Sequence, residues 1–230
     1  MLRTHFQLIA ALIVALLSSA ANAQFAGTLE LVPKGCEELG QCKLKSAFRF
    51  TDSSKIVWEA REDLPTDGAS IPGIFQPFVG SPFDPAFVKA AVIHDHYCDR
   101  HVRPWRQTHK VFYEGLLASG VSRSKAKSMY FAVFLGGPKW ITLEPGKNCG
   151  LNCVNNFKST SGVAGIYSRR ADYSASDVAP AVQSVGKLLE LNPDVLSLEE
   201  LERMAEKICP KDFFYKNGDK LDASILGITE

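Results

Sequence analysis

Hydrophobic and polar residues alternate in three short segments that follow the first 23 residues. The segments are residues 28–32, 44–51 and 56–60. A period of two sends successive side chains to opposite faces, which is typical of antiparallel strands with one buried face. The polar turn at residues 52–55 joins the last two segments. The pattern predicts a small N-terminal antiparallel sheet.

Five later segments carry apolar residues every three or four positions and are predicted to be helices. The first three begin at Pro85, near Pro104 and at Ser122, and the last two span residues 178–191 and 198–208. Asp84 and Ser122 are suited to cap the first and third helices, and residues 197–200 form a capping box. Residues 139–176 show no clear period.

Together these elements predict an α+β fold. We expect the N-terminal sheet, a three-helix core and a C-terminal helical tail that is tied down by a disulfide. We divide the chain into a core domain at residues 24–140 and a helical appendage at residues 141–230. Asn217-Gly218 is a turn signal that predicts a small hairpin near the end.

Residues 1–23 have the composition of a secretory signal peptide. Arg3 and His5 precede an apolar run at residues 6–17, and Ala21-Asn22-Ala23 provides a small-residue cleavage site. The alternative is a membrane anchor, but the run is about twelve residues, whereas a bilayer core needs roughly twenty. We therefore expect a secreted or periplasmic protein with no transmembrane segment in its mature chain.

Six cysteines remain after removal of the predicted signal peptide: Cys36, Cys42, Cys98, Cys149, Cys153 and Cys209. In an oxidising compartment three disulfides are the default, and about fifteen pairings are open. The short spacings favour Cys36–Cys42 and Cys149–Cys153, which would leave Cys98 to pair with Cys209 and tie the tail to the core. Zinc binding by Cys149 and Cys153 is the weaker alternative.

The chain has 26 lysines and arginines against 25 aspartates and glutamates. Its basic residues are scattered and form no stripe along one face. This balance gives no electrostatic basis for binding nucleic acid or an anionic membrane.

Four of the five histidines lie between residues 94 and 109. His94 and Asp95 are adjacent in an apolar helix, where they can supply a general base beside a metal ligand, or two metal ligands. His94 and Cys98 share one helix face, and His109 lies on the inward face of the next helix. We expect His96 and His101 to be solvated.

Several segments resemble one bacterial and phage family, called domain of unknown function 1353. They are Thr66-Asp67-Gly68-Ala69-Ser70-Ile71-Pro72, Ala90-Ala91-Val92-Ile93-His94-Asp95, residues 106–112, Gly120-Val121, and Met129-Tyr130-x-Ala132-Val133. The resemblance covers about residues 50–140, and the family name implies no activity. Asp67, Ser70 and Arg106 are candidate supporting residues because they lie in these segments.

The Ala-Ala-x-x-His-Asp helix is also similar, more distantly, to phospholipase A2 of the parvovirus capsid and prokaryotic secreted kinds. This resemblance implies that His94 is a general base and that Asp95 holds calcium together with loop carbonyls near Gly80. Calcium would polarise the ester carbonyl. The resemblance predicts a metal-assisted hydrolase that acts on phospholipid or another envelope substrate.

Two residues depart from the phospholipase pattern. Cys98 and His109 stand where that pattern has a tyrosine and an aspartate that orient the catalytic imidazole. A zinc site built from His94, Cys98 and His109 is therefore one alternative, with Asp67 or Asp95 as a further ligand. A non-catalytic, disulfide-stabilised binding module is the other alternative.

Overall fold

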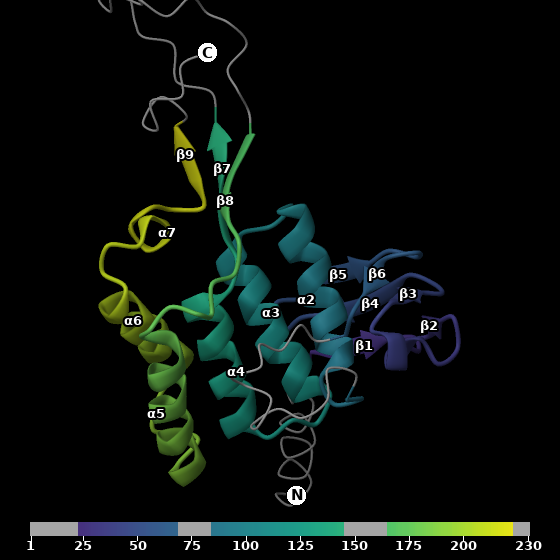
Figure 1. Ribbon diagram of the computed structural model, residues 1–230, viewed down its shortest axis with the longest axis horizontal. Coiled ribbons are helices and arrows are strands. Elements are labelled where there is room, and N and C mark those ends of the chain that lie inside the picture. Colours follow the sequence, from purple (N-terminus) through teal and green to yellow (C-terminus); the bar gives the residue numbers. More distant parts are fainter. Residues whose placement is uncertain (1–22, 69–83, 145–164, 223–230) are drawn as a thin grey trace, which may run out of the picture.

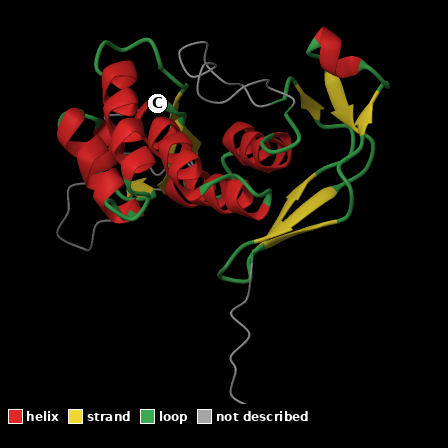
Figure 2. Cartoon of the chain, turned by 90° about the horizontal axis from the view of Figure 1, so that it is seen from below, coloured by secondary structure: helices red, strands yellow, loops and turns green. Residues whose placement is uncertain are grey.

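The computed structural model describes residues 23–68, 84–144 and 165–222 (Figure 1). Figure 1 and Figure 2 show the N-terminal strands at one end of the molecule and helices α5 (Val178–Leu191) and α6 (Leu198–Ile208) at the other. Three helices lie between these two ends. The predicted α+β class, with small antiparallel sheets before a helical core, is confirmed.

The N-terminal region contains two three-stranded antiparallel sheets rather than one. The first has the order β1 (Gln24–Ala26), β4 (Phe48–Thr51), β5 (Val57–Ala60). The second has the order β2 (Leu31–Val32), β3 (Cys42–Leu44), β6 (Pro65–Thr66). The predicted strand at residues 44–51 is thus divided between two sheets, because residues 45–47 leave one ladder before the other begins.

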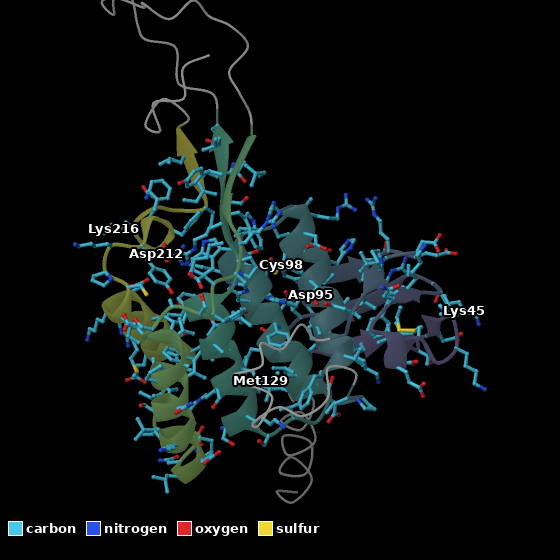
Figure 3. All side chains as sticks on the ribbon, in the orientation of Figure 1. Lys45, Asp95, Cys98, Met129, Asp212 and Lys216 are labelled. Carbon is cyan, nitrogen blue, oxygen red and sulfur yellow. A yellow bond between two sulfur atoms is a disulfide. The ribbon has the colours of Figure 1, made fainter. Side chains whose placement is uncertain are left out.

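A disulfide joins Cys36, in the 3₁₀ helix η2 (Cys36–Leu39), to Cys42 in β3. Figure 3 shows this bond among the N-terminal strands. The predicted disulfide between Cys98 and Cys209 is wrong, because both are free thiols and the sulfur of Cys98 faces His94. No disulfide among the described residues therefore ties the tail down. The predicted pair of residues 149 and 153 lies outside the described residues.

The core helices are α2 (Val88–Arg100), α3 (Trp105–Ala118) and α4 (Arg123–Gly136). They confirm the three predicted helices, although α2 begins three residues after Pro85. Asp84 caps the preceding turn by accepting a hydrogen bond from the Ala86 N–H at 2.8 Å. Ser122 caps α4 as predicted, because its hydroxyl accepts from the Lys125 N–H.

A third sheet follows the core helices in a region where the sequence showed no period. Its order is β8 (Gly165–Arg169), β7 (Lys139–Glu144), β9 (Lys220–Asp222). Strand β7 gives no alternation because it is buried on both faces over residues 139–141. The predicted hairpin at Asn217-Gly218 is wrong, since β9 pairs in parallel with β7 instead of returning on a neighbouring strand.

Helices α5 and α6 have the predicted bounds, and the predicted capping box at Ser197 and Glu200 is present. Both helices pack on α4, and α7 (Phe213–Lys216) follows them. Side chains of α3, α4, α5 and α6 belong to one hydrophobic cluster. The boundary at residue 140 stays a prediction, although the described tail shares its core with the helices before it.

Helix α2 separates two hydrophobic clusters. Ala90 and Ala91 pack with α3 and α4, whereas Val92 and Ile93 pack with Phe50 and the N-terminal strands. His94 and Asp95 directly follow these residues on α2, so they lie where the two hydrophobic clusters meet. Among the described residues, no helix has the length and apolar character that crossing a membrane requires.

The carboxylate of Asp52 stabilises the first sheet by accepting three hydrogen bonds. One carboxylate oxygen accepts from the Ser54 and Ile56 N–H groups at 2.9 and 2.8 Å, and the other accepts from the buried indole of Trp58 at 2.8 Å. Asp52→Ala leaves that indole N–H without a partner. We expect the free energy of unfolding to fall by about 2 kcal/mol. Urea denaturation measures it, and an effect no larger than that of the control Ser53→Ala would contradict this account.

Candidate functional site

His94 lies in the middle of the molecule, at the midpoint of α2. Its Nε2 is 2.9 Å from Nδ1 of His109 on α3, and its Nδ1 is 3.1 Å from Oδ1 of Asp95. The ring also packs against Phe112, with ring centroids 4.8 Å apart. The structure thus confirms that the inward faces of the two helices bring His94 and His109 together. Figure 3 shows the neighbouring Asp95 and Cys98 in this central position.

The backbone behind His109 fixes the protonation of its ring. His109 is fully buried, and its Nε2 is 3.1 Å from the carbonyl oxygen of Pro138. A carbonyl only accepts hydrogen bonds, so Nε2 of His109 carries the proton. Burial, together with the electrostatic influence of His94 and Lys139, lowers the pKa of His109 well below its ordinary value. The ring is therefore neutral, and its Nδ1 is a bare acceptor that faces His94.

This assignment leaves one unusual contact on the other side of His94. Because Nδ1 of His109 accepts, Nε2 of His94 must donate to it. Nδ1 of His94 and the carboxylate of Asp95 then face each other as two acceptors unless one proton is shared between them. Burial raises the pKa of Asp95 above its ordinary value, whereas its hydrogen bond to His94 acts in the opposite direction. A proton held between Nδ1 of His94 and Oδ1 of Asp95 makes this contact a hydrogen bond.

Cys98 completes a compact group of ligand atoms. Its Sγ is 3.4 Å from Nε2 of His94. The sulfur, one nitrogen of His94 and one nitrogen of His109 all lie within 4.8 Å of one another. Burial, together with the charges of Asp95 and Asp99, raises the pKa of Cys98 well above its ordinary value. The thiol keeps its proton unless a cation takes the proton's place.

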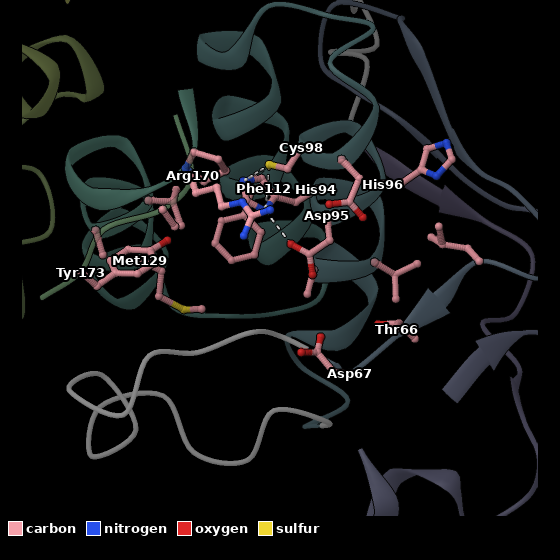
Figure 4. A pocket seen from close by; sticks show the side chains of 18 of the residues that line it. Thr66, Asp67, His94, Asp95, His96, Cys98, Phe112, Met129, Arg170 and Tyr173 are labelled. Atoms are coloured by element: carbon pink, nitrogen blue, oxygen red, sulfur yellow. Dashed lines mark hydrogen bonds and ion pairs between the residues drawn. The ribbon is translucent and has the colours of Figure 1, made fainter. Parts of the chain in front are cut away.

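These residues border a cavity of about 1460 Å³ that extends from the N-terminal strands to α4 and α5. His94, Asp95 and Cys98 line it from α2, and Met129 and Val133 line it from α4. Figure 4 shows Asp95 near the centre, Thr66 and His96 on one side, and Arg170 and Tyr173 on the other. His109 does not line the cavity and lies behind His94. A second, smaller cavity of about 360 Å³ lies near Cys209 and Asp212.

The structure brings together some of the predicted site residues and separates others. Asp67 lines the same cavity as His94, Asp95 and Cys98. Arg106 does not line it, because its guanidinium lies over the Trp105 ring and points to the carbonyls of residues 214 and 215 in α7. Ser70 and Gly80 lie outside the described residues, so their predicted roles stay predictions.

Two predictions for neighbouring histidines need correction. His96 is buried, with 4% of its surface exposed, because α2 turns it towards the N-terminal strands; it is not solvated. Burial lowers the pKa of His96 below its ordinary value. His101 is half-buried, and its ring centroid is 4.7 Å from that of Trp140.

Two residues that the sequence pattern did not predict line the cavity from the segment after β8. Arg170 is exposed there, and Tyr173 is partly buried. Burial is the main cause that raises the pKa of Tyr173 above its ordinary value, and the electrostatic influence of Cys98 and Asp95 acts in the same direction. The tyrosine therefore keeps its proton. Both residues lie in the stretch without a clear period, where a pattern could not place them.

The donor atoms around His94 suit a transition metal better than calcium. Calcium takes about six to eight oxygen ligands. Among the described residues, the carboxylates electrostatically coupled to Asp95 are Asp67 and Asp99, and the carbonyl predicted near Gly80 lies outside them. Two imidazole nitrogens and one sulfur, by contrast, are the ligand types that zinc prefers.

Comparison with known proteins gives a family and no activity. The profile of the family described as "Protein of unknown function (DUF1353)" matches residues 42–133. A relative in Sinorhizobium fredii (strain NBRC 101917 / NGR234), "Uncharacterized protein y4iH", is 42% identical over 170 residues, which cover 73% of this chain and 71% of the relative. "Uncharacterized protein y4jT" of the same organism is 40% identical over 131 residues, or 55% of this chain and 39% of its own length.

No solved structure matches the chain at a significant level. The similarity to phospholipase A2 therefore stays a prediction, whereas the match to the family profile confirms the resemblance that the sequence motifs indicated. The chain belongs to the DUF1353 family of proteins of unknown function.

Proposed function

We propose that this protein is a metal-assisted hydrolase whose zinc-like ion is held by His94, His109 and Cys98 at the floor of the cavity. The observation that carries the proposal is the contact between the two imidazoles. Nε2 of His94 and Nδ1 of His109 face each other at 2.9 Å, with the sulfur of Cys98 beside them. A metal ion between these atoms takes the place of a proton.

The hydrogen bonds on the outer side of each ring support this proposal. With an ion bound to its Nε2, His94 carries its proton on Nδ1 and donates it to Asp95. His109 already donates from Nε2 to the Pro138 carbonyl. The contact between Nδ1 of His94 and the carboxylate of Asp95 thereby becomes an ordinary charge-assisted hydrogen bond. Histidine ligands of metals regularly donate their outer N–H to a carboxylate or a backbone carbonyl in this way.

The separations of the ligand atoms are close to those that zinc requires. Zinc–nitrogen bonds of about 2.0–2.1 Å and a zinc–sulfur bond of about 2.3 Å, at tetrahedral angles, place ligand atoms roughly 3.3–3.6 Å apart. The two separations measured from Nε2 of His94 are 2.9 Å to His109 and 3.4 Å to Cys98. The third separation, from the sulfur of Cys98 to a ring nitrogen of His109, lies within 4.8 Å.

The position of the cluster favours catalysis over a purely structural role. Structural zinc sites use four protein ligands, whereas catalytic sites use three and leave a position for water. Here three ligands are at hand, and His94 and Cys98 border the cavity. Bound there, the ion would act as a Lewis acid on a substrate carbonyl and on water.

Asp95 is placed to move the proton during hydrolysis. One of its oxygens holds His94, and the other has no hydrogen-bond partner among the described residues. Water forms a bond to the ester carbonyl carbon and gives one proton to Asp95. The bond to the alcohol oxygen then breaks, and Asp95 returns the proton to that oxygen. The products are a carboxylic acid and an alcohol.

The predicted substrate, phospholipid or another envelope ester, is part of the proposal. The apolar wall formed by Met129, Ala132, Val133 and Val182 suits an acyl chain. The predicted signal peptide would bring the protein to the secreted or periplasmic space, where such a substrate occurs.

The calcium-dependent alternative assigns a different role to His94. A general base needs Nδ1 of His94 to be bare and open to water, but this atom faces Asp95 at 3.1 Å. That contact favours the role of metal ligand. The two roles can be separated by experiment, since chelators distinguish zinc from calcium.

The test combines metal analysis of the purified protein with an ester hydrolysis assay. We expect one zinc per chain, and hydrolysis of p-nitrophenyl butyrate or of phosphatidylglycerol vesicles that phenanthroline stops and that added zinc, but not calcium, restores. His94→Ala should abolish both metal binding and hydrolysis, whereas the control His101→Asn should retain both. Hydrolysis that needs calcium would support the alternative, and neither metal nor hydrolysis would indicate a binding module.

A further inference from the structure

Tyr173, in the segment after β8, lines the cavity on the side away from Asp67. We infer that the hydroxyl of Tyr173 donates a hydrogen bond to the substrate oxygen that becomes negatively charged during hydrolysis. This inference rests on the proposed function, because it adds a catalytic residue to the same site. Figure 4 shows Tyr173 and Met129 on the side of the cavity away from Thr66 and Asp67.

Tyr173 faces the same space as the proposed metal ligands. It lines the cavity together with His94, Asp95 and Cys98. Figure 4 shows Tyr173 on one side of this cavity, with Cys98 and Asp95 nearer its centre. A substrate in this cavity would be bordered by both His94 and Tyr173.

The end of α4 fixes the position of Tyr173. The N–H of Asp172 donates to the carbonyl of Gly136 at 2.8 Å. The Tyr173 ring packs so closely on Gly136 that a Cβ at that position would lie 2.7 Å from the ring. The carboxylate of Asp172 accepts two further hydrogen bonds, from the N–H and the hydroxyl of Ser174. These contacts hold the tyrosine before substrate arrives.

A prepositioned donor of this kind accelerates ester hydrolysis. The carbonyl oxygen gains negative charge as water attacks, and a prepositioned O–H stabilises that charge more than a mobile group does. Arg170 also lines the cavity, but its side chain is exposed to solvent, which screens its charge. Tyr173 is therefore the stronger candidate.

The decisive variant is Tyr173→Phe, which removes the hydroxyl and keeps the ring that packs on Gly136. With p-nitrophenyl butyrate as substrate we expect kcat to fall by about 100-fold, with little change in KM. Zinc content should stay at one per chain. Tyr167→Phe is the matched control, because it removes a hydroxyl from an exposed tyrosine of β8 that does not line the cavity.

A second variant, Gly136→Ala, tests the placement of the ring. The added methyl group pushes the ring away, so we expect a loss of kcat similar to that of Tyr173→Phe, again with zinc retained. Normal turnover by Tyr173→Phe, in a protein whose wild type binds zinc and hydrolyses the ester, overturns this inference alone. A wild-type protein that binds no metal and hydrolyses nothing overturns the proposed function and this inference together.

Discussion

Cys98→Ala is expected to weaken zinc binding by at least about 100-fold, since the loss of a ligand should exceed the effect of losing an outer hydrogen-bond partner. The sulfur lies 3.4 Å from Nε2 of His94 and is the third ligand atom of the proposed site. The thiol is small, and Cys98 is partly exposed to solvent. Its removal should therefore leave the fold intact. In the calcium-dependent alternative, Cys98 holds no metal, and the same change would leave metal binding unaffected.

Cys209→Ala is a matched control for this experiment. It removes the other free thiol of the described residues, which lies beyond α6 and borders the smaller cavity. Competition against a chromogenic zinc chelator gives the affinities of the two variants and the wild type. Cobalt substitution provides an independent signal, because a thiolate ligand produces a charge-transfer absorption band that Cys98→Ala would lack. Equal zinc affinities in all three proteins would contradict the proposed site.

Lys139→Met is expected to remove a pH dependence of stability worth about 3 kcal/mol. Lys139 is fully buried beside Asp212, which lies 3.7 Å away and also pairs with Arg169. Burial, and the positive charge of Arg169, lower the pKa of Lys139 from 10.5 to about 8. Between these two pH values the unfolded chain binds a proton that the folded chain does not. The contribution of Lys139 to the free energy of unfolding therefore rises with pH across this window.

The measurement is the difference in unfolding free energy between wild type and variant at pH 7 and at pH 10.5. We expect this difference to shift by about 3 kcal/mol in favour of the wild type as the pH rises. Lys187→Met removes an exposed lysine of α5 and should give parallel curves. Parallel curves for Lys139→Met would show that the lysine has a similar pKa in the folded and unfolded chains.

The parts of the fold that the sequence predicted are those with one buried face. The capping box at Ser197 and the period of three to four residues gave the bounds of α5 and α6. Strand β7 has no such signal, since Trp140 and Ile141 are both buried and the alternation disappears. The pairing of β7 with β9 joins residues about eighty positions apart, and no local pattern encodes it.

The candidate site was predictable to the same extent. Helical spacing placed His94 and Cys98 on one face and turned His109 towards them. It did not place Arg106, which lies three positions before His109 but contacts α7 instead of the cavity. Tyr173 could not be found at all, because it reaches the cavity through the packing of an irregular segment on Gly136.

The pairing of β7 with β9 has a consequence for how the protein is made. Strand β7 directly follows Pro138, whose carbonyl orients His109, and its neighbour β9 is at residues 220–222. A nascent chain leaves the ribosome N-terminus first, so α2 and α3 are available long before β9. The strand pairing that supports the segment behind His109 is therefore completed only after residues 220–222 have been synthesised. A chain that ended before residue 220 would contain His94, Cys98 and His109 but would lack the strand that pairs with β7 behind His109.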